Sequence, residues 1–309
     1  MLRLFLESSC DNACLGIVES LSYVVKDLRT NSNTLNKVYG GVVPNLIRRS
    51  HTANLDYTLL KGFSLILESP CIHYTNKPGL LSCLLITSVT SHLINYIYNK
   101  KLFKVDHQLS HLQSPSLKVF KKYSFSGKKL PFIKFLNLIV SGKTTKMYLF
   151  YNTYKTLYLR KTIDDSLGES FDKGARVLNL FALTGSSIEY YCNVNTNVKK
   201  KPLLLSNKGP VEFISYSGFK TKLKGLVSLE SAGVLSLCNY YQQITLGKLI
   251  ITLQTFVKKF RAEGLLISGG VIKNRYLNKN LFFISKGMGI VYIPSNRKYS
   301  EDNPIMLSH

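Results

Sequence analysis

Residues 2–26 read LRLFLESSCDNACLGIVESLSYVVK. Three short apolar runs, residues 2–7, 14–19 and 21–26, are separated by turn-forming residues, which is typical of a meander of neighbouring strands. In the second half, residues 133–151 (IKFLNLIVSGKTTKMYLFY) repeat this pattern around a Ser-Gly-Lys-Thr turn. Each half of the chain is therefore predicted to open with paired strands.

Helical patterns follow the strands in both halves. Apolar residues recur at helical spacing in five segments, residues 45–60, 80–97, 164–180, 225–240 and 243–263. Further short strands are expected at residues 63–68, 102–105 and 265–268, the last of which runs into Gly269-Gly270. Strands mixed with helices twice over predict an α/β protein of two similar lobes. We expect residues 1–115 to form the N-terminal lobe and residues 116–309 the C-terminal lobe, with the two interleaved near the C-terminus.

The bulk composition is that of a globular protein. Of the 309 residues, 45% are hydrophobic and 19% are charged. A chain of this length and hydrophobic content can bury two cores. The longest apolar segment, residues 80–97, is shorter than the ~20 residues of a membrane span and contains polar residues, so a buried helix is expected. Six scattered cysteines without a CxxC pair favour a reducing compartment. The first strand begins at residue 2, so no leader is expected and the prediction is a cytoplasmic protein, with an organellar matrix as the alternative.

The chain is strongly basic, with 41 Lys+Arg against 17 Asp+Glu and a formal charge of +24. Such an excess favours a polyanionic partner, because each neutralised phosphate releases a condensed counterion. An AT-rich genome would give a similar Lys-rich composition without selection for binding. The charge alone therefore leaves nucleic-acid binding open.

His107 and His111 are four residues apart in a segment expected to be helical, so both rings lie on one face. This spacing suits two imidazoles on one metal ion, and two unrelated histidines are the alternative. A zinc-protease motif would need Glu as the general base directly after the first histidine. Gln108 stands there and cannot accept a proton, which argues against a protease.

Three other polar positions have both a structural and a functional interpretation. Asp11 follows the first strand, where it could position a phosphate or its metal or could simply form a turn. Asp172 could bind a ribose hydroxyl or pair with Arg176 one turn later. The Gly-Gly pair before Asn274 could receive a base or phosphate, or could serve only as a tight turn.

A series of short motifs runs in order along nearly the whole chain. They are SSCD at 8–11, GGVVP at 40–44, RSH at 49–51, PGL at 78–80, HQLSH at 107–111, SG at 141–142, DDSLGESFDK at 164–173, YSGFKT at 216–221, SGGV at 268–271 and EDN at 301–303. Together they resemble the tRNA N6-adenosine threonylcarbamoyltransferases (TsaD-like), in the form of the bacterial and organellar branch. Each motif alone is weak, but the ordered series is specific.

The resemblance implies an actin-like, Hsp70-like (ASKHA) fold, in which two RNase H-like lobes flank an interlobe cleft. It implies one divalent metal per chain, iron in preference to zinc, bound by His107, His111 and Asp302. It also gives Asp11 a catalytic role. The implied substrate and nucleotide contacts are Ile139, Val140, Ser141, Gly142, Lys143, Asp172, Gly185, Glu189 and Asn274.

The implied reaction moves the threonylcarbamoyl group of threonylcarbamoyl-AMP, the donor, to N6 of adenosine 37 in tRNAs that read ANN codons. The implied partners are the tRNA anticodon loop, an inactive paralogue subunit and a small ATPase; no membrane is expected. A sugar or acetate kinase on the same fold would need a DxGxT-like opening, which residues 9–12 do not supply.

The chain also departs from the family pattern. Lys143 replaces the second glycine of the family's VSGGHT loop, Gly185 is the one glycine kept from YPGGP, and the chain ends six residues after Asn303, earlier than is usual. These departures favour an alternative, a catalytically weakened scaffold or tRNA-binding subunit of the same modification complex.

Overall fold

The structure is a computed structural model. It describes residues 2–9, 12–20, 23–31, 44–116, 134–152, 155–181, 183–194, 214–230, 232–296, 300 and 302–308. The chain divides into two units, Met1–Phe125 with Lys298–His309, and Ser126–Arg297. The lobes 1–115 and 116–309, interleaved near the C-terminus, stay an expectation from the sequence. In the structure the C-terminal segment belongs to the first unit, because Ile305, Met306 and Leu307 are buried against Phe5 and Val18.

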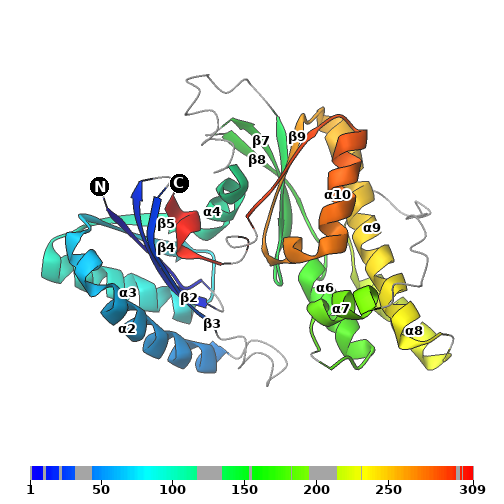
Figure 1. Ribbon diagram of the computed structural model, residues 1–309, viewed down its shortest axis with the longest axis horizontal. Coiled ribbons are helices and arrows are strands. Elements are labelled where there is room, and N and C mark those ends of the chain that lie inside the picture. The colour runs from blue at the N-terminus through cyan, green and yellow to red at the C-terminus, as the bar shows by residue number, and fades with distance from the viewer. Residues whose placement is uncertain are drawn as a thin grey trace. The chain divides into compact units, whose positions relative to one another are not determined.

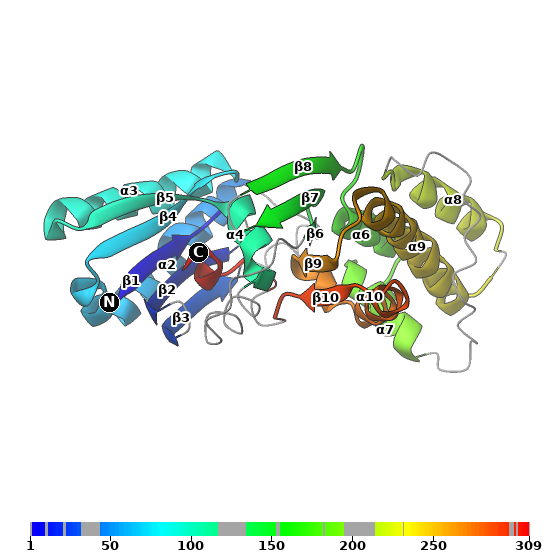
Figure 2. The same ribbon diagram turned by 90° about the horizontal axis from the view of Figure 1, so that it is seen from above.

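The first unit is built on a five-stranded sheet. Its order is β3 (Tyr23–Asn31), β2 (Asn12–Ser20), β1 (Arg3–Glu7), β4 (Cys71–Lys77) and β5 (Lys101–Asp106), as Figure 2 shows. β1, β2 and β3 pair antiparallel, which confirms the predicted meander, whereas β1, β4 and β5 run parallel. The carboxyl ends of three strands therefore meet at one edge, where open α/β sheets bind their ligands.

The two faces of this sheet are covered differently. Leu4 and Leu6 point to a core beneath α2 (Pro44–Glu68) and α3 (Leu81–Tyr98), two helices that lie together on one side of the sheet (Figure 1). Phe5 and Val18 point to the opposite face, where they pack against the short 3₁₀ helix η4 (Pro304–Ser308). Side chains alternate along a strand, so Glu7 lies on the same face as Phe5.

Two expectations about these helices are wrong. The strand predicted at residues 63–68 is the last part of α2, because the helical periodicity continues to Glu68. α3 was expected to be buried, but only Cys83, Thr87, Ser91 and Ile94 are buried. Within the described chain, α3 alone is long and apolar enough to cross a membrane, with a mean hydropathy of 1.2. One such helix is weak evidence for a span.

The second unit holds the other sheet. Its order is β10 (Val291–Pro294), β9 (Gly264–Ser268), β6 (Phe135–Val140), β7 (Thr145–Asn152) and β8 (Lys155–Lys161). β6, β9 and β10 are parallel, and the β6–β7–β8 meander is antiparallel. This unit therefore repeats the sheet of the first unit, as the repeated sequence pattern predicts.

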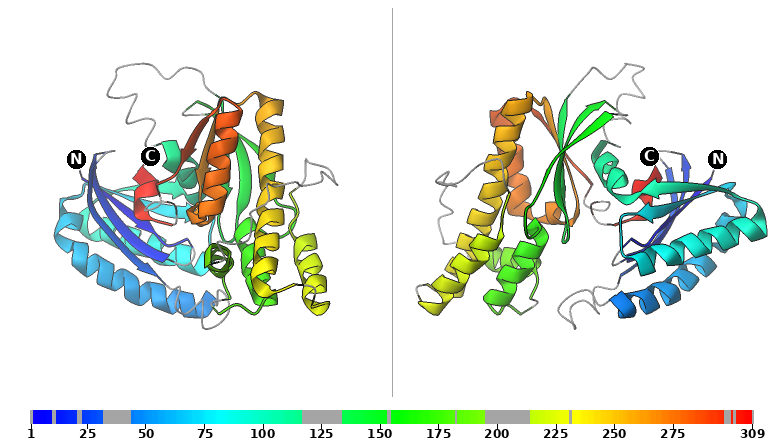
Figure 3. Two further views of the ribbon diagram at one scale, coloured as in Figure 1. Left: turned by 45° about the vertical axis from the view of Figure 1, so that its right-hand side comes forward. Right: turned by 180° about the vertical axis from the view of Figure 1, so that it is seen from behind.

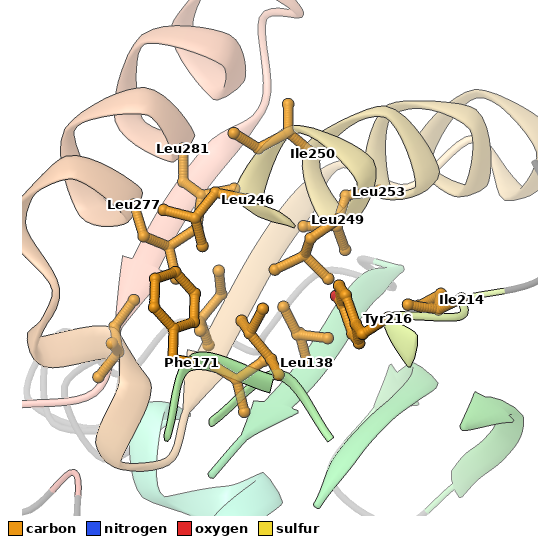
Figure 4. Packing of buried hydrophobic residues seen from close by; sticks show 14 of the residues in the cluster. Leu138, Phe171, Ile214, Tyr216, Leu246, Leu249, Ile250, Leu253, Leu277 and Leu281 are labelled. Atoms are coloured by element: carbon orange, nitrogen blue, oxygen red, sulfur yellow. The ribbon is translucent and has the colours of Figure 1, made fainter. Parts of the chain in front are cut away.

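In the described part of this unit, five helices accompany the sheet. They are α6 (Leu167–Val177), α7 (Gly185–Val194), α8 (Ser217–Ser228), α9 (Val234–Phe260) and α10 (Arg275–Gly287). Leu138 of β6 packs with Phe171, Leu249 and Leu277 from these helices in a large core (Figure 4). α9 is one long helix that runs along α8 (Figure 3).

The helix boundaries predicted here, 225–240 and 243–263, are wrong. α8 ends at Ser228, and α9 runs from Val234 to Phe260 without a break at residues 240–243. Asn239 is buried within α9, and its amide donates to the Leu235 carbonyl at 3.1 Å, which compensates for the loss of water. Gly233 is the extended N-cap residue of α9, which begins at Val234.

Candidate functional site

The two histidines begin a short helix at the edge where β5 ends. α4 (His107–Gln113) is capped by Asp106, whose carboxylate accepts the N–H groups of Gln108 and Leu109 at 2.9 and 3.1 Å. This cap sets the first turn. His107 and His111 consequently face the same way, with ring centroids 4.6 Å apart and nearly perpendicular rings.

Asp302 reaches these rings from the other end of the sequence. The buried η4 anchors it, and Pro304 can approach β2 only because residue 16 is glycine: a Cβ there would lie 2.7 Å from the Pro304 Cβ. The Oδ1 atom of Asp302 lies 3.0 Å from His111 Nε2 and 3.6 Å from His107 Nε2. The structure thus brings the three predicted metal ligands together.

The three side chains fit a divalent metal ion. One potential ligand atom from each lies within 4.8 Å of the others. Two imidazoles and one carboxylate are a common donor set for iron or zinc and leave coordination positions open for a substrate. Within the described part of the chain, the buried Nδ1 of His111 has no hydrogen-bond partner. The cluster is therefore a possible metal site.

A fourth group, which the sequence did not single out, stands behind His107. Glu7 is fully buried at the end of β1, and its Oε2 lies 3.2 Å from His107 Nδ1. The same oxygen accepts the hydroxyl of Thr75 on β4, while Oε1 accepts the Ser9 N–H at 2.7 Å. An acidic residue directly after the apolar run Leu4–Leu6 was the available signal.

The charges of this pair stabilise each other. Burial alone would lower the pKa of His107, but the carboxylates of Glu7 and Asp302 outweigh it and raise the pKa to about 9. Burial alone would raise the pKa of Glu7, and its contact with His107 lowers it instead. Without a metal ion, the two groups form a buried ion pair.

The predicted catalytic residue, Asp11, lies outside the described residues. Its role remains a prediction from the resemblance.

In the second unit, the predicted nucleotide-binding turn follows β6. The turn is closed by the Ser141 N–H, which donates to the Thr144 carbonyl at 2.8 Å, and by the Ser141 hydroxyl, which accepts the Thr144 N–H at 3.0 Å. The Ser166 hydroxyl donates to the Gly142 carbonyl at 2.7 Å, and a Cβ at Gly168 would lie 2.7 Å from the Gly142 Cα. The turn is therefore held against the start of α6.

The other predicted nucleotide contacts lie on neighbouring helix ends. Asp172 in α6 accepts the N–H of Gly185, the first residue of α7, at 2.8 Å. Glu189 in α7 accepts the N–H of Arg275, the first residue of α10, at 2.7 Å. Asn274 caps α10 by accepting the Leu277 N–H at 2.8 Å. These side chains thus hold the starts of two helices, α7 and α10, which is a structural role whether or not they also bind a nucleotide.

Three further predicted nucleotide contacts, Ile139, Val140 and Lys143, differ in the groups that they could present to a ligand. Ile139 and Val140 are buried strand residues, so only their backbone could touch a ligand. Lys143 is exposed in the turn, beside Gly142, which has open space where a Cβ would be. A cation at this place can reach an anion as a point charge.

Comparison with known proteins agrees with the motifs. The sequence model of the family "tRNA N6-adenosine threonylcarbamoyltransferase" matches residues 23–309. A relative of that name from Francisella philomiragia is 32% identical over 100% of this chain and 92% of its own length. One from Malacoplasma penetrans is 26% identical over 99% and 97%.

Solved structures show the same fold at low identity. HypF of T. kodakarensis superposes with a TM-score of 0.62 at 12% identity, over 99% of this chain and 46% of HypF. Component A of the Acidaminococcus fermentans (R)-2-hydroxyglutaryl-CoA dehydratase gives 0.53 at 10% identity, over 100% and 96%. These likenesses confirm the predicted α/β, actin-like (ASKHA) fold. By its motifs and its full-length relatives, this chain belongs to the tRNA N6-adenosine threonylcarbamoyltransferase family of acyltransferases.

Proposed function

We propose that this chain transfers the threonylcarbamoyl group from threonylcarbamoyl-AMP to N6 of adenosine 37 in ANN-decoding tRNAs, in the cytoplasm or an organellar matrix. The observation that carries the proposal is the convergence of His107, His111 and Asp302, although Asp302 lies 191 residues after His111 in the sequence. A protein retained only as a scaffold has no need to bring two imidazoles and a carboxylate within 4.8 Å.

The proposed reaction is an acyl transfer. The adenosine N6 attacks the carbamoyl carbon, a C–N bond forms, the C–O bond to the adenylate phosphate breaks, and AMP leaves. A divalent ion, most simply Fe²⁺, held by His107, His111 and Asp302 would supply Lewis acidity toward the threonylcarbamoyl group. Backbone N–H groups of residues 141–144 and the side chain of Lys143 would hold the adenylate phosphate. Asp11 would orient N6 or accept its proton.

The alternative function, a scaffold of the modification complex, is favoured by Lys143. A long side chain stands where the family's glycine lets the backbone approach the nucleotide. Incubating the chain and its partners with threonylcarbamoyl-AMP and unmodified tRNA separates the two functions. Modified adenosine in the digested tRNA supports the transferase, whereas tRNA binding without product supports the scaffold.

We propose that the tRNA backbone contacts the β7–β8 hairpin. Residues 145–161 contain Lys146, Lys155, Arg160 and Lys161 and no acidic residue. Tyr158 is 50% exposed, and its ring meets that of Tyr148 edge-on at 5.5 Å. Cations beside exposed aromatic rings suit a nucleic-acid backbone and its unpaired bases. Basic residues on an edge strand also prevent strand-to-strand aggregation, so a binding measurement is needed.

Replacing Arg160 and Lys161 together with Gln is expected to weaken tRNA binding about tenfold at moderate salt. The slope of log affinity against log salt concentration should fall by roughly 1.4–1.8, since each of the two lost phosphate contacts removes about 0.7–0.9. Filter binding over a salt series measures both. The matched control is Lys258→Gln with Lys279→Gln, two exposed lysines on α9 and α10. If both pairs give the same slope, the hairpin has no special role.

We further propose that an exposed apolar stripe on α3 binds a protein partner, the inactive paralogue subunit. The stripe consists of Leu81, Leu85, Val89, Leu93 and Ile97, spaced four residues apart on the helix surface. No charged residue occurs between residues 81 and 98. Such a surface suits the apolar face of a partner helix and not an RNA. The small ATPase is proposed to join the same complex, without an assigned surface.

Replacing Leu85 and Leu93 with Ser is expected to weaken binding of the paralogue about 30-fold, which corresponds to roughly 2 kcal/mol for a central contact. The two side chains are 51% and 55% exposed, so the melting temperature of the free chain should change little. Isothermal titration with the purified paralogue tests this, with the exposed Leu229→Ser as control. Unchanged affinity, or flotation of the free wild-type chain with lipid vesicles, would contradict it.

A further inference from the structure

We propose that Glu7 is a positioning residue for the metal site, and that its carboxylate accepts the His107 Nδ1–H and so keeps Nε2 free to bind the metal. The proposal rests on the proposed metal-assisted function. It adds to that function a residue outside the ligand set.

The geometry assigns different tasks to the two nitrogens of the His107 ring. Nδ1 lies 3.2 Å from Glu7 Oε2 and 3.1 Å from the Ser9 hydroxyl. Nε2 faces Asp302 Oδ1 at 3.6 Å, on the side where His111 also points. A neutral imidazole carries its proton on one nitrogen only, and the other nitrogen is the ligand. The ring can serve the metal site only if the proton is on Nδ1.

The neighbours of Nδ1 decide where that proton sits. The Ser9 hydroxyl can donate or accept, so it tolerates either tautomer. An ionised carboxylate can only accept, so it requires a hydrogen on Nδ1. Glu7 therefore selects the tautomer that the metal site needs, which is how outer carboxylates act on metal-bound histidines.

The surroundings of Glu7 hold its carboxylate in the orientation that accepts the His107 Nδ1–H. The side chain is fully buried on the sheet face that carries η4, between β2 and β4. Its Oε1 is occupied by the Ser9 N–H at 2.7 Å, and its Oε2 also accepts the Thr75 hydroxyl. A carboxylate buried in this way is costly unless donors surround it. The three donors fix its rotation and point Oε2 at His107.

A purely structural role for Glu7 makes a different prediction. In that case, the carboxylate would only tie Ser9 and Thr75 to the end of β1. Losing it would lower stability but would leave the tautomer and the metal affinity of His107 unchanged. Metal binding and the tautomer are therefore the readouts that distinguish the two roles.

The Glu7→Gln variant keeps the shape of the side chain. Its amide has only one acceptor oxygen, so it cannot accept hydrogen bonds from both Ser9 and His107 as the carboxylate does. In one orientation, the amide NH₂ faces the Ser9 N–H, donor against donor. In the other, it donates to His107 Nδ1 and moves the ring proton to Nε2. We expect Zn²⁺ affinity, measured by competition with a chromophoric chelator, to fall 10- to 100-fold. Thr75→Val removes another donor from the same oxygen without touching His107, and its affinity should stay within about threefold of the wild type.

Nitrogen NMR of the Zn²⁺-loaded, full-length wild-type chain tests the same point without relying on a variant. The expected spectrum shows His107 protonated at Nδ1 and metal-bound at Nε2. A ring bound through Nδ1, a Glu7→Gln variant that folds and binds Zn²⁺ as tightly as wild type, or a wild type that binds no Zn²⁺ would overturn the proposal. Zn²⁺ bound with the expected tautomer to a chain that forms no modified adenosine would support Glu7 and contradict the transferase instead.

Discussion

Replacing His107 with Ala is expected to abolish stable metal binding and to lower the rate of tRNA modification by at least 100-fold. His107 provides one of three converging ligand atoms, and two remaining ligands, His111 and Asp302, hold an ion much less tightly. The variant also leaves the buried Glu7 carboxylate without its charged partner. Metal content after gel filtration, measured by mass spectrometry, and nucleoside analysis of the tRNA report the two losses separately.

The matched control is His92→Ala. His92 is an exposed histidine on α3, outside the cluster, and its Nδ1 lies 2.7 Å from the Ser88 carbonyl. It should keep both metal and activity. A His107→Ala protein with the metal content of the wild type would show that the ion binds elsewhere.

Replacing Gly269 with Ala is expected to lower the free energy of unfolding of the second unit by about 2–5 kcal/mol. Gly269 has φ of +96°, a conformation that costs an L-residue roughly 1–2 kcal/mol. Its Cβ would lie 2.2 Å from the Val140 carbonyl oxygen, and such overpacking adds about 1–3 kcal/mol. Thermal denaturation should show a melting temperature lower by on the order of 10 °C.

Gly225→Ala is the control for this substitution. Gly225 lies inside α8, and nothing is within 4 Å of the position that a Cβ would take. Alanine there should be neutral or stabilise by up to about 1 kcal/mol, because glycine is a poor helix former. A Gly269→Ala protein as stable as the wild type would mean that the β6–β9 contact relaxes freely.

Local sequence pattern predicted most strands of both sheets, because alternating apolar runs and turn residues are local signals. It failed at residues 63–68, which look like a strand by themselves but continue the helical periodicity of α2 to Glu68. It also failed where the outcome depends on contacts far along the chain. The apolar residues of α3 gave the helix correctly but could not show that its outer side is left uncovered in this chain.

Only part of the candidate site could be predicted from local sequence pattern. Helical spacing places His107 beside His111, but spacing cannot place Asp302, which was named from the resemblance alone. The structure brings all three together, and metal binding itself remains a prediction. Glu7 was missed because its function depends on β4 and α4 lying beside β1, a pairing that no local pattern shows.

The most direct test of the central proposal is the nucleoside composition of an ANN-decoding tRNA after a single round of reaction. The wild-type chain, its partners, iron and threonylcarbamoyl-AMP are incubated with unmodified tRNA, and adenosine 37 is examined by mass spectrometry. The account predicts threonylcarbamoyladenosine with the wild type and none with His107→Ala. If a folded wild-type chain still binds tRNA but adenosine 37 stays unmodified, the result would contradict the transferase function and support the scaffold function.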